Sequence, residues 1–347
     1  MNKLPRPAEI IHTDCRSQKS TLDPSRPIKM LQWNIERGYK LDAIIEELRS
    51  LDADVLALQE LDIGCERSNN EDTGMRIAEA LGLNYVFLCE FEELYSPLRD
   101  ASSQGGGVHG NAILSKFDIS EPSVIEHNAH PIDWENPKHP LAVKEPRHGR
   151  RLTLAATLHT PQGPVLLYTA HLECFCGMLS RMQQFSDILS HARQHAARVP
   201  HQAILGDLNT LANGVARLSP YYCNDQMRWW TLGWFEAEVW DQVVLRCRED
   251  ANHPKKINTW AAAAGLPEQV CQNLVNPGFE DPFDVRKDVT IDLPKYRFLG
   301  FHLMTGKLDW VLLRRFEVLK KLMGNDKYDK SDHKWLLVEA NLEGIKN

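Results

Sequence analysis

Short apolar segments, each running into a polar motif, recur along most of this chain and constrain its fold more than any other feature. Residues 55–58 run into Gln59-Glu60, and residues 203–205 run into Gly206-Asp207. Segments of this length and composition are typical of strands buried on both faces, so the polar residues that follow lie at the rim of a sheet. The sequence therefore predicts buried sheets whose edge gathers carboxylates, amides and histidines.

Helical periodicity separates these strands. Residues 40–51 and 73–81 carry apolar side chains at helical spacing, and residues 178–196 contain the longest such stripe, which we interpret as a core face. Strands are expected at residues 28–33, 55–58, 85–91, 111–115, 151–158, 165–172, 203–205, 308–313 and 335–338. Residues 121–148 are expected to form a long surface excursion. Strands alternating with helices, together with a hairpin around residues 160–163, fit two sheets packed face to face with helices outside.

The spread of the motifs indicates the domain organisation. They extend from Asn34 to His333, which favours one domain over residues 28–343 in this chain of 347 residues. Residues 1–27 hold four prolines among polar residues and are interpreted as a flexible or surface-draped N-terminal arm. The sequence shows neither the apolar core of a signal peptide nor an apolar run long enough for a transmembrane helix, so we expect an intracellular location, cytoplasmic or nuclear.

Charge and cysteine content narrow the class of protein. The formal net charge of -7 argues against a broad basic surface for duplex DNA, while a local basic groove stays open. The eight cysteines are interpreted as reduced core thiols rather than as a disulfide framework. Cys174 and Cys176 have the spacing of half a zinc site, but no second close pair completes it, so we favour a structural role.

The pair Asp207 and Asn209 suits hydrolytic chemistry. Residues two apart in an extended chain point the same way, so both side chains are expected to project together. A carboxylate beside an amide can orient and deprotonate a water while the amide holds a phosphoryl oxygen. An Asx turn that caps a strand has the same residue types, and the sequence leaves both interpretations open.

Oxygen-bearing side chains at two strand ends indicate a cation site. Glu60 emerges from a buried strand, and Asn34 follows another. Because Mg²⁺ and Mn²⁺ select oxygen ligands, Glu60 is the expected direct ligand and Asn34 its neutral partner.

Histidines form the third group of candidate site residues. We expect His333 to stabilise or protonate a phosphoryl transition state, with Asp309 holding its imidazole in the correct tautomer. His171 is either a donor to a phosphate oxygen or a satisfied structural group. Three others are interpreted as surface residues: His127, His130 and His195.

Two loops are open to more than one interpretation. The glycine run at residues 105–107 lacks the Lys-Ser/Thr of a P-loop, so we interpret it as a flexible loop beside the site. Arg147, Arg150 and Arg151 precede a strand and either reach a phosphate or form a solvated basic turn.

Seven motifs in fixed order carry a family resemblance. They are Trp33-Asn34, Gln59-Glu60, Gly110-Asn111-Ala112-Ile113-Leu114-Ser115, Thr169-Ala170-His171-Leu172-Glu173, Gly206-Asp207-Leu208-Asn209, Leu308-Asp309-Trp310 and Ser331-Asp332-His333. Together they resemble the endonuclease/exonuclease/phosphatase (deoxyribonuclease I-like) superfamily over roughly residues 28–343. The resemblance implies a four-layered α/β sandwich, with two packed mixed β-sheets flanked by helices, and in-line hydrolysis of a phosphoester by water that depends on Mg²⁺ or Mn²⁺.

Candidate site residues follow position by position. The expected catalytic residues are Asp207, Asn209, His171, His333 and Asp309. The expected metal-binding residues are Glu60, Asn34 and Asp332. The expected substrate-contacting residues are Arg151, Asn111 and Cys174.

Substrate specificity stays open at this point. A phosphodiesterase or nuclease-type enzyme is favoured, with nucleic acid or protein-linked nucleic acid among its substrates. Alternatives are a phosphatase, a sphingomyelinase-like phospholipid phosphodiesterase, or a non-catalytic scaffold that recognises phosphate. His171-Leu172-Glu173 resembles the 5′-tyrosyl-DNA phosphodiesterase branch, whose motif continues with serine where this chain has Cys174.

An aromatic-rich insertion is expected at about residues 211–305. Its aromatic residues either stack on a substrate or form the core of a subdomain, and we favour the core. They are Tyr221, Tyr222, Trp229, Trp230, Trp234, Phe235 and Trp240.

Overall fold

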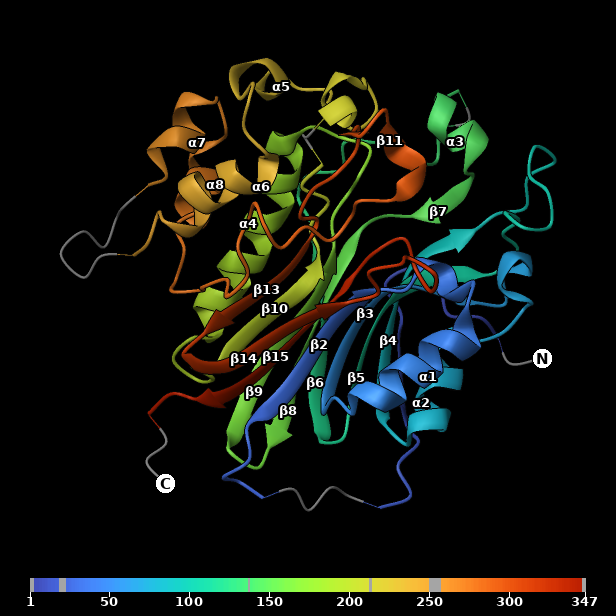
Figure 1. Cartoon of the computed structure of the whole chain (residues 1–347), viewed down its shortest axis with the longest axis vertical. Helices are drawn as coiled ribbons and strands as arrows, with labels where there is room; N and C mark the ends of the chain where they lie inside the picture. The colour runs from blue at the N-terminus through green and yellow to red at the C-terminus, as the bar shows by residue number, and fades with distance from the viewer. Residues whose placement is uncertain (1–2, 19–22, 137, 212–213, 250–256, 345–347) are drawn as a thin grey trace.

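Two mixed β-sheets packed face to face form the centre of the molecule (Figure 1). The computed structural model describes residues 3–18, 23–136, 138–211, 214–249 and 257–344. The first sheet has eight strands: β1 (Ile10–Asp14), β4 (Asn84–Glu93), β5 (Val108–Ser115), β3 (Val55–Ile63), β2 (Ile28–Asn34), β15 (Trp335–Leu342) and β14 (Phe316–Gly324) in that order, with β7 (Arg147–Gly149) paired to β4. The second has five: β13 (Asp309–Arg314), β10 (Gln202–Asp207), β9 (Gly163–His171), β8 (Leu152–Thr160) and β6 (Asp118–Glu126).

Helices cover the outer face of each sheet. The α-helices are α1 (Leu41–Leu51), α2 (Thr73–Leu81), α3 (Pro140–Lys144), α4 (Met178–His195), α5 (Met227–Trp230), α6 (Glu236–Trp240), α7 (Thr259–Ala263) and α8 (Glu268–Asn273). Shorter helical turns are η1 (Glu36–Gly38), η2 (Glu66–Ser68), η3 (Gly214–Leu218), η4 (Asp241–Leu245) and η5 (Pro294–Tyr296). A separate hairpin pairs β11 (Arg297–Phe298) with β12 (Phe301–His302).

Three apolar cores join these parts into four layers. One core lies between the sheets, a second joins the eight-stranded sheet to α1 and α2, and a third joins the five-stranded sheet to α4 and the helices of the insertion. Each fully buried aliphatic side chain contributes roughly 1.5–3 kcal/mol, so these cores dominate the packing. The predicted four-layered α/β sandwich with two packed mixed sheets is confirmed.

Local signals explain where the first two helices begin and end. Helix α1 ends at Asp52, which adopts φ 48°, and α2 ends at Gly82, which adopts φ 63°. Such left-handed residues satisfy the last helical carbonyls. The side chain of Asp72 accepts a hydrogen bond from the Met75 backbone N–H and caps the start of α2. Both helices lie within a residue of the ranges predicted from their periodicity.

Some expectations about secondary structure were wrong. Residues 10–14 of the expected arm form β1, which pairs with β4, and β14 has no counterpart in the sequence prediction. The expected surface excursion at residues 121–148 begins inside β6 and includes buried side chains such as Trp134. His127, which belongs to this stretch, is buried rather than exposed. These segments were missed because β1, β6 and β14 are edge strands with many polar residues, and Glu121 lies at a bulge with φ 50°.

The aromatic side chains of the insertion differ in how far they are buried. Trp240 is buried in the core under α4. Four others expose about half or more of their surface, which contradicts the expectation of a core role for the set. They are Tyr221 (49%), Trp229 (50%), Trp230 (66%) and Trp234 (50%).

Two general features complete the fold. All eight cysteines are free thiols. Among the described residues, no helix combines the length and the apolar content that crossing a membrane requires.

Candidate active site

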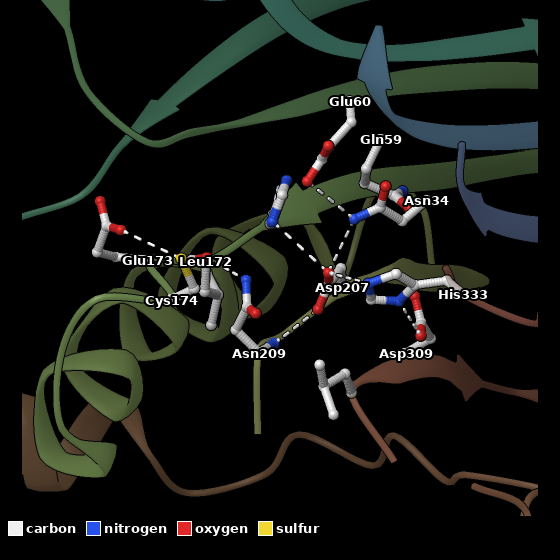
Figure 2. Close-up of polar contacts among 12 residues, drawn as sticks. Asn34, Gln59, Glu60, Leu172, Glu173, Cys174, Asp207, Asn209, Asp309 and His333 are labelled. Atoms are coloured by element: carbon white, nitrogen blue, oxygen red, sulfur yellow. Dashed lines mark hydrogen bonds and ion pairs between the residues drawn. The ribbon is translucent and has the colours of Figure 1, made fainter. Parts of the chain in front are cut away.

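The polar motifs meet at one end of the two facing sheets. In the five-stranded sheet His171 ends β9, Asp207 ends β10 and Asp309 begins β13. The strand registers place Asp207 directly beside both His171 and Asp309. Asn34 ends β2 in the opposite sheet, so the two sheets bring its amide across to the Asp207 carboxylate (Figure 2).

A histidine–carboxylate pair spans the gap between the sheets. His333 Nδ1 lies 2.7 Å from Asp309 Oδ2, and both residues are buried. The loop that carries His333 is fixed by two hydrogen bonds to the end of β2: Ser331 Oγ donates to the Asn34 carbonyl (2.6 Å), and Trp33 Nε1 donates to the His333 carbonyl (3.1 Å). His333 Nε2 is then directed at Asp207 Oδ2, at 3.6 Å.

This geometry shifts the pKa values of two side chains. Burial alone would lower the pKa of His333, but Asp309 and Asp207 outweigh it and hold the pKa well above its usual range. Burial raises the pKa of Asp207 to about 7, although His333 opposes the shift. The site therefore pairs an imidazolium with a carboxyl group that titrates near neutral pH.

Asp207 receives three further contacts. Asn34 Nδ2 donates to its Oδ2 at 3.0 Å, and the Asn209 backbone N–H donates to its Oδ1 at 2.9 Å. His171 Nε2 lies 3.5 Å from Oδ2. The carboxylate is thus held at a fixed position from several sides.

Asn209 does not point alongside Asp207 as expected. Its backbone has φ 50°, and its Nδ2 donates to the Leu172 carbonyl at 2.8 Å. The extended strand stops at Asp207, so the two-residue alternation no longer applies beyond it. The bond from the Asn209 N–H to the Asp207 side chain is an Asx turn, the other interpretation of this motif.

Glu60 reaches the site because β3 is irregular. The pairing of β3 with β5 shifts between Leu58 and Leu61, and Glu60 adopts φ 59°. Bulges of this kind redirect a side chain, and a left-handed residue other than glycine is strained. Glu60 Oε1 lies 3.3 Å from Asn34 Nδ2, and its Oε2 lies 3.9 Å from Arg37 Nε. Burial favours a raised pKa for Glu60, but Arg37 and His171 outweigh it and lower the pKa.

Glu36 joins this group and was not predicted from the sequence. Its Oε2 accepts a hydrogen bond from the Asp332 backbone N–H (3.0 Å), and its own N–H donates to Asn34 Oδ1 (3.1 Å). Burial, followed by repulsion from Asp332 and Glu60, raises the pKa of Glu36 to about 7. The spacing of Asn34 and Glu36, two apart after a strand, is the signal that would have found it.

Three mutually repelling carboxylates with an amide oxygen form a donor set that suits Mg²⁺ or Mn²⁺. Beyond burial, Asp332 and Glu60 raise the pKa of Glu36, and Glu60 raises the pKa of Asp332, so a bound cation would relieve this repulsion. A second group, Asp207, Asp309 and His333, has ligand atoms within 4.8 Å of one another among the described residues. In that group, however, His333 Nδ1 is already bonded to Asp309.

Arg151 and His171 form a buried pair. Arg151 Nη1 contacts Glu90 Oε2 at 2.9 Å and His171 Nδ1 at 3.1 Å. Because arginine only donates, His171 accepts at Nδ1 and carries its proton on Nε2. Burial, reinforced by Arg151, lowers the pKa of His171 well below its usual range. The alternative of a solvated basic turn holds for Arg150, which pairs with Glu126, but not for the buried Arg147 and Arg151.

Several buried polar atoms around the site have no hydrogen-bond partner in the described structure. Asn111 is the clearest case, because it is fully buried and both its Oδ1 and its Nδ2 are unpaired. Arg151 Nε and Arg37 Nε are unpaired as well. Unsatisfied buried groups are rare in native proteins, and a bound ion, water or ligand is among their explanations.

The surroundings of Cys174 and of the glycine run differ from those predicted. Burial and the nearby Glu173 raise the pKa of the Cys174 thiol, and its side chain packs against an apolar cluster beyond the site. The glycine run is closely packed rather than flexible. The Gly105 carbonyl accepts from the Glu66 N–H, and a Cβ on Gly107 would lie 2.2 Å from the Ile63 carbonyl oxygen.

The fold and the site together define a class of protein. An α/β sandwich that collects carboxylates, amides and a histidine–aspartate pair at one sheet edge is a scaffold for phosphate and divalent-cation chemistry. The chain belongs to the endonuclease/exonuclease/phosphatase family, whose family model matches residues 31–333. Members of this family hydrolyse phosphoester bonds.

Solved structures agree with this fold. An endonuclease/exonuclease/phosphatase from Beutenbergia cavernae is 18% identical, with a TM-score of 0.52 over 92% of this chain and 72% of that one. The catalytic domain of human Nocturnin, which holds a sulfate anion, is 16% identical, with a TM-score of 0.50 over 97% and 100% of the two chains. TDP2 from C. elegans is 14% identical, with a TM-score of 0.50 over 93% and 77%. No curated protein sequence matches this chain significantly. Identities this low establish the fold alone.

Proposed function

We propose that this protein is a divalent-metal-dependent phosphodiesterase in which water attacks the phosphorus atom. The observation that carries the proposal is the position of Asp207. Its carboxylate lies between the His333–Asp309 pair and the Asn34–Glu60 pair, within 3.6 Å of the His333 imidazole and 3.0 Å of the Asn34 amide. A base, a cationic donor and a metal-binding carboxylate therefore converge on one small volume.

The residues present suit Mg²⁺ or Mn²⁺, which Glu60 would hold together with Asn34, Glu36 and Asp332. A bound cation polarises the phosphoryl oxygens and neutralises charge that develops on them. Burial, together with repulsion from Asp332 and Glu60, raises the pKa of Glu36 to about 7. A bound cation would remove that repulsion, which supports this assignment.

Asp207 is the proposed base. It orients a water and accepts a proton from it as the water oxygen bonds to phosphorus and the bond to the leaving oxygen breaks. A carboxyl group with a pKa of about 7 is near its optimum for this transfer at neutral pH. Asn209 fixes the position of Asp207 through its backbone N–H.

His333, His171 and Asn111 are the proposed phosphoryl contacts. His333 is held as an imidazolium by Asp309 and stabilises the charge that develops in the transition state. His171 presents an N–H at Nε2 towards the site, because Arg151 occupies its Nδ1. Asn111 supplies an amide that has no protein partner, so phosphate binding would satisfy it.

Hydrolysis of bis-p-nitrophenyl phosphate with Mg²⁺ or Mn²⁺ tests the proposal. Asp207→Asn and Glu60→Gln should each lower kcat by at least about a hundredfold, the scale on which a positioned proton acceptor contributes. The surface variants Asp241→Asn and Glu317→Gln are the matched controls and should keep full activity. Activity that survives chelation of the metal, or that both site variants retain, would refute the proposal. Comparison with the monoester p-nitrophenyl phosphate separates a diesterase from a phosphatase.

A further inference from the structure

An exposed hairpin projects apolar side chains next to the site. It is formed by β11 and β12, and its turn residues Leu299 (φ 46°) and Gly300 (φ 81°) both have left-handed backbones. Hairpin turns of this type favour Asn-Gly or Asp-Gly, yet this one carries a leucine that is 83% exposed. Phe298 and Phe301 are 62% and 70% exposed on either side of it. A strained and solvated leucine contributes nothing to the stability of the free protein.

A second exposed apolar segment lies at the same end of the molecule, on and after α5 (Figure 1). Trp229 and Trp230 belong to α5, and Leu232 and Trp234 follow it with exposures of 60% and 50%. Clusters of exposed large apolar side chains mark interaction surfaces on soluble proteins. We name the hairpin and this segment together the apolar rim, defined by Trp229, Trp230, Leu232, Trp234, Phe298, Leu299 and Phe301.

The apolar rim is continuous with the wall of the candidate active site. Tyr222, which precedes α5, and Tyr296, which directly precedes β11, pack against the same buried cluster as Cys174. That cluster includes Leu308, whose carbonyl accepts a hydrogen bond from the Leu208 N–H. Leu208 and Leu308 directly adjoin the site residues at the ends of β10 and β13. A ligand bound at the rim therefore lies beside the phosphoryl site.

Charge on the two segments is opposite in sign to the charge of the whole chain. Residues 214–235 and 293–305 contain four basic residues and one acidic residue, whereas the chain has a formal net charge of -7. Asp292, directly before the second range, pairs with Arg297 and His302 and offsets part of this local positive charge. Arg228 lies over the Trp229 ring at 4.7 Å, and Lys295 lies over the Tyr296 ring at 5.2 Å. Within the described ranges neither cation forms a salt bridge, but Arg228 donates to the Cys223 carbonyl at 3.3 Å, and the charge of Lys295 acts on Glu36 and Asp332 in the site.

The residue types distinguish between two anionic partners. Single-stranded nucleic acid binds to flat aromatic faces with cations between them, and exposed leucines add nothing to stacking. A membrane interface places tryptophan and basic residues at the headgroups while leucine and phenylalanine enter the acyl region. Leucine occupies the tip of the hairpin here and also lies between the tryptophans of the other segment. These residue types favour a lipid surface.

We propose that the apolar rim docks the protein on an anionic phospholipid bilayer and presents the active site to a phosphoester carried by that bilayer. The substrate half of this inference rests on the proposed function. The docking half rests on the exposed side chains alone.

Vesicle binding tests the docking half. Wild-type protein should sediment with phosphatidylcholine vesicles that contain phosphatidylserine, with a blue shift of its tryptophan fluorescence, and less with phosphatidylcholine alone. The double variant Leu299→Ser/Phe301→Ser should bind at least about tenfold more weakly, because insertion of one large apolar side chain is worth more than a tenfold change in affinity. Leu319→Ser/Leu322→Ser is the matched control, since these two leucines of β14 are 53% and 39% exposed, and it should bind like wild type.

Enzyme assays test the substrate half. Release of water-soluble phosphorus from the vesicles should fall with binding in Leu299→Ser/Phe301→Ser, while hydrolysis of soluble bis-p-nitrophenyl phosphate stays unchanged. Vesicle binding by a wild-type protein that hydrolyses neither substrate would support docking and refute the proposed function.

Three results would overturn the docking proposal. The first is equal vesicle binding by the wild type and the hairpin variant. The second is quenching of the tryptophan fluorescence by a single-stranded oligonucleotide in a protein that does not bind vesicles, which would identify a nucleic-acid surface. The third is a concentration-dependent dimer that the hairpin variant abolishes, again without vesicle binding, which would identify a second copy of the chain as the partner.

Discussion

His333 Nδ1 lies 2.7 Å from Asp309 Oδ2, and this contact joins the two sheets of the sandwich at the candidate active site. Asp309 begins β13 of the five-stranded sheet, whereas His333 precedes β15 of the eight-stranded sheet. The second oxygen of Asp309 accepts from Gln32 Nε2 at 2.8 Å, so the carboxylate is held by both oxygens. The orientation of the imidazole thus depends on how the two sheets pack.

Asp309→Asn tests the importance of this contact. The amide should misplace or reverse the imidazole tautomer, and kcat should fall by about 10²–10⁴, as in other enzymes where an aspartate orients a histidine. KM should change little, because Asp309 does not touch the substrate in our proposal. Asp292→Asn is the control, since Asp292 pairs with the exposed His302 at 2.6 Å. An Asp309→Asn enzyme with normal kcat would show that the pair is only structural.

Asn111→Leu should separate stability from activity. Both polar atoms of this buried side chain lack partners, so an apolar residue of similar size should leave the free energy of unfolding unchanged or raise it by up to about 2 kcal/mol. Phosphodiesterase activity should fall at least about tenfold, since each hydrogen bond to a charged group contributes on the order of 1.5–3 kcal/mol. Urea denaturation and steady-state kinetics measure the two effects.

Gln59→Leu is the contrasting variant. Gln59 accepts from Gln32 and donates to Thr169 at 2.8 and 2.9 Å, so its loss should cost about 1–3 kcal/mol of stability. If Asn111→Leu proves as destabilising as Gln59→Leu, the amide of Asn111 has protein partners and its assignment to phosphate is wrong.

The pH dependence of stability should report on Asp207. Its pKa is raised to about 7 by burial, so between about pH 4 and 7 the unfolded chain ionises while the folded chain keeps the proton. The free energy of unfolding of the metal-free protein therefore loses up to about 4 kcal/mol from this group as the pH rises through that window.

Asp207→Asn removes this contribution. The stability of the variant relative to wild type should increase from pH 4 to pH 7 and then level off, as measured by urea denaturation with EDTA present. A relative stability that is flat across that range would show that Asp207 is ionised throughout.

Metal binding should raise thermal stability through Glu60. The acidic group of Glu36, Glu60 and Asp332 repels itself without a cation, so Mg²⁺ at a hundred times its Kd should stabilise the fold by about 2.7 kcal/mol. Glu60→Gln should abolish most of the Mg²⁺-dependent increase in Tm, whereas the exposed Glu317→Gln should retain it. An equal increase in both variants would place the cation elsewhere.

A buried ion pair should anchor the insertion to α4. Arg181 donates to both oxygens of Glu236, at 2.9 and 2.7 Å, and both side chains are fully buried. Arg181→Met should cost about 3–5 kcal/mol, because it removes both hydrogen bonds of a buried ion pair from one side. The double variant Arg181→Met/Glu236→Leu should recover much of this loss. Calorimetry of the wild type, the double variant and the single variants Arg181→Met and Glu236→Leu measures these losses, and additive losses would argue against a coupled pair.

Sequence patterns predicted the elements that are buried and periodic. Residues 55–58 and 203–205 were predicted as strands because apolar residues run without interruption, and residues 178–196 as a helix because their apolar stripe repeats at helical spacing. The strands β1, β6 and β14 lie at sheet edges, where one side is solvated and the pattern is weak.

The candidate site was predicted in its residue types but only partly in its geometry. Asp309 and His333 meet as expected, and Asn34, Glu60 and Asp207 share one volume. Asn209 turns away because its backbone leaves the strand. Glu36 was missed although its spacing from Asn34 is a sequence signal, whereas the unpaired amide of Asn111 is evident only when the two sheets face each other.

The sequence by itself determined the buried strands, the periodic helices, the family, and the residue types that arrive at each strand end. These properties depend on local periodicity and on short motifs, which a linear chain displays directly. Only the tertiary structure decided that a bulge directs Glu60 into the site, that Arg151 is buried against His171, and that four aromatic residues of the insertion stay exposed. Those properties depend on backbone dihedral angles and on contacts between segments distant in the chain, which no local pattern encodes.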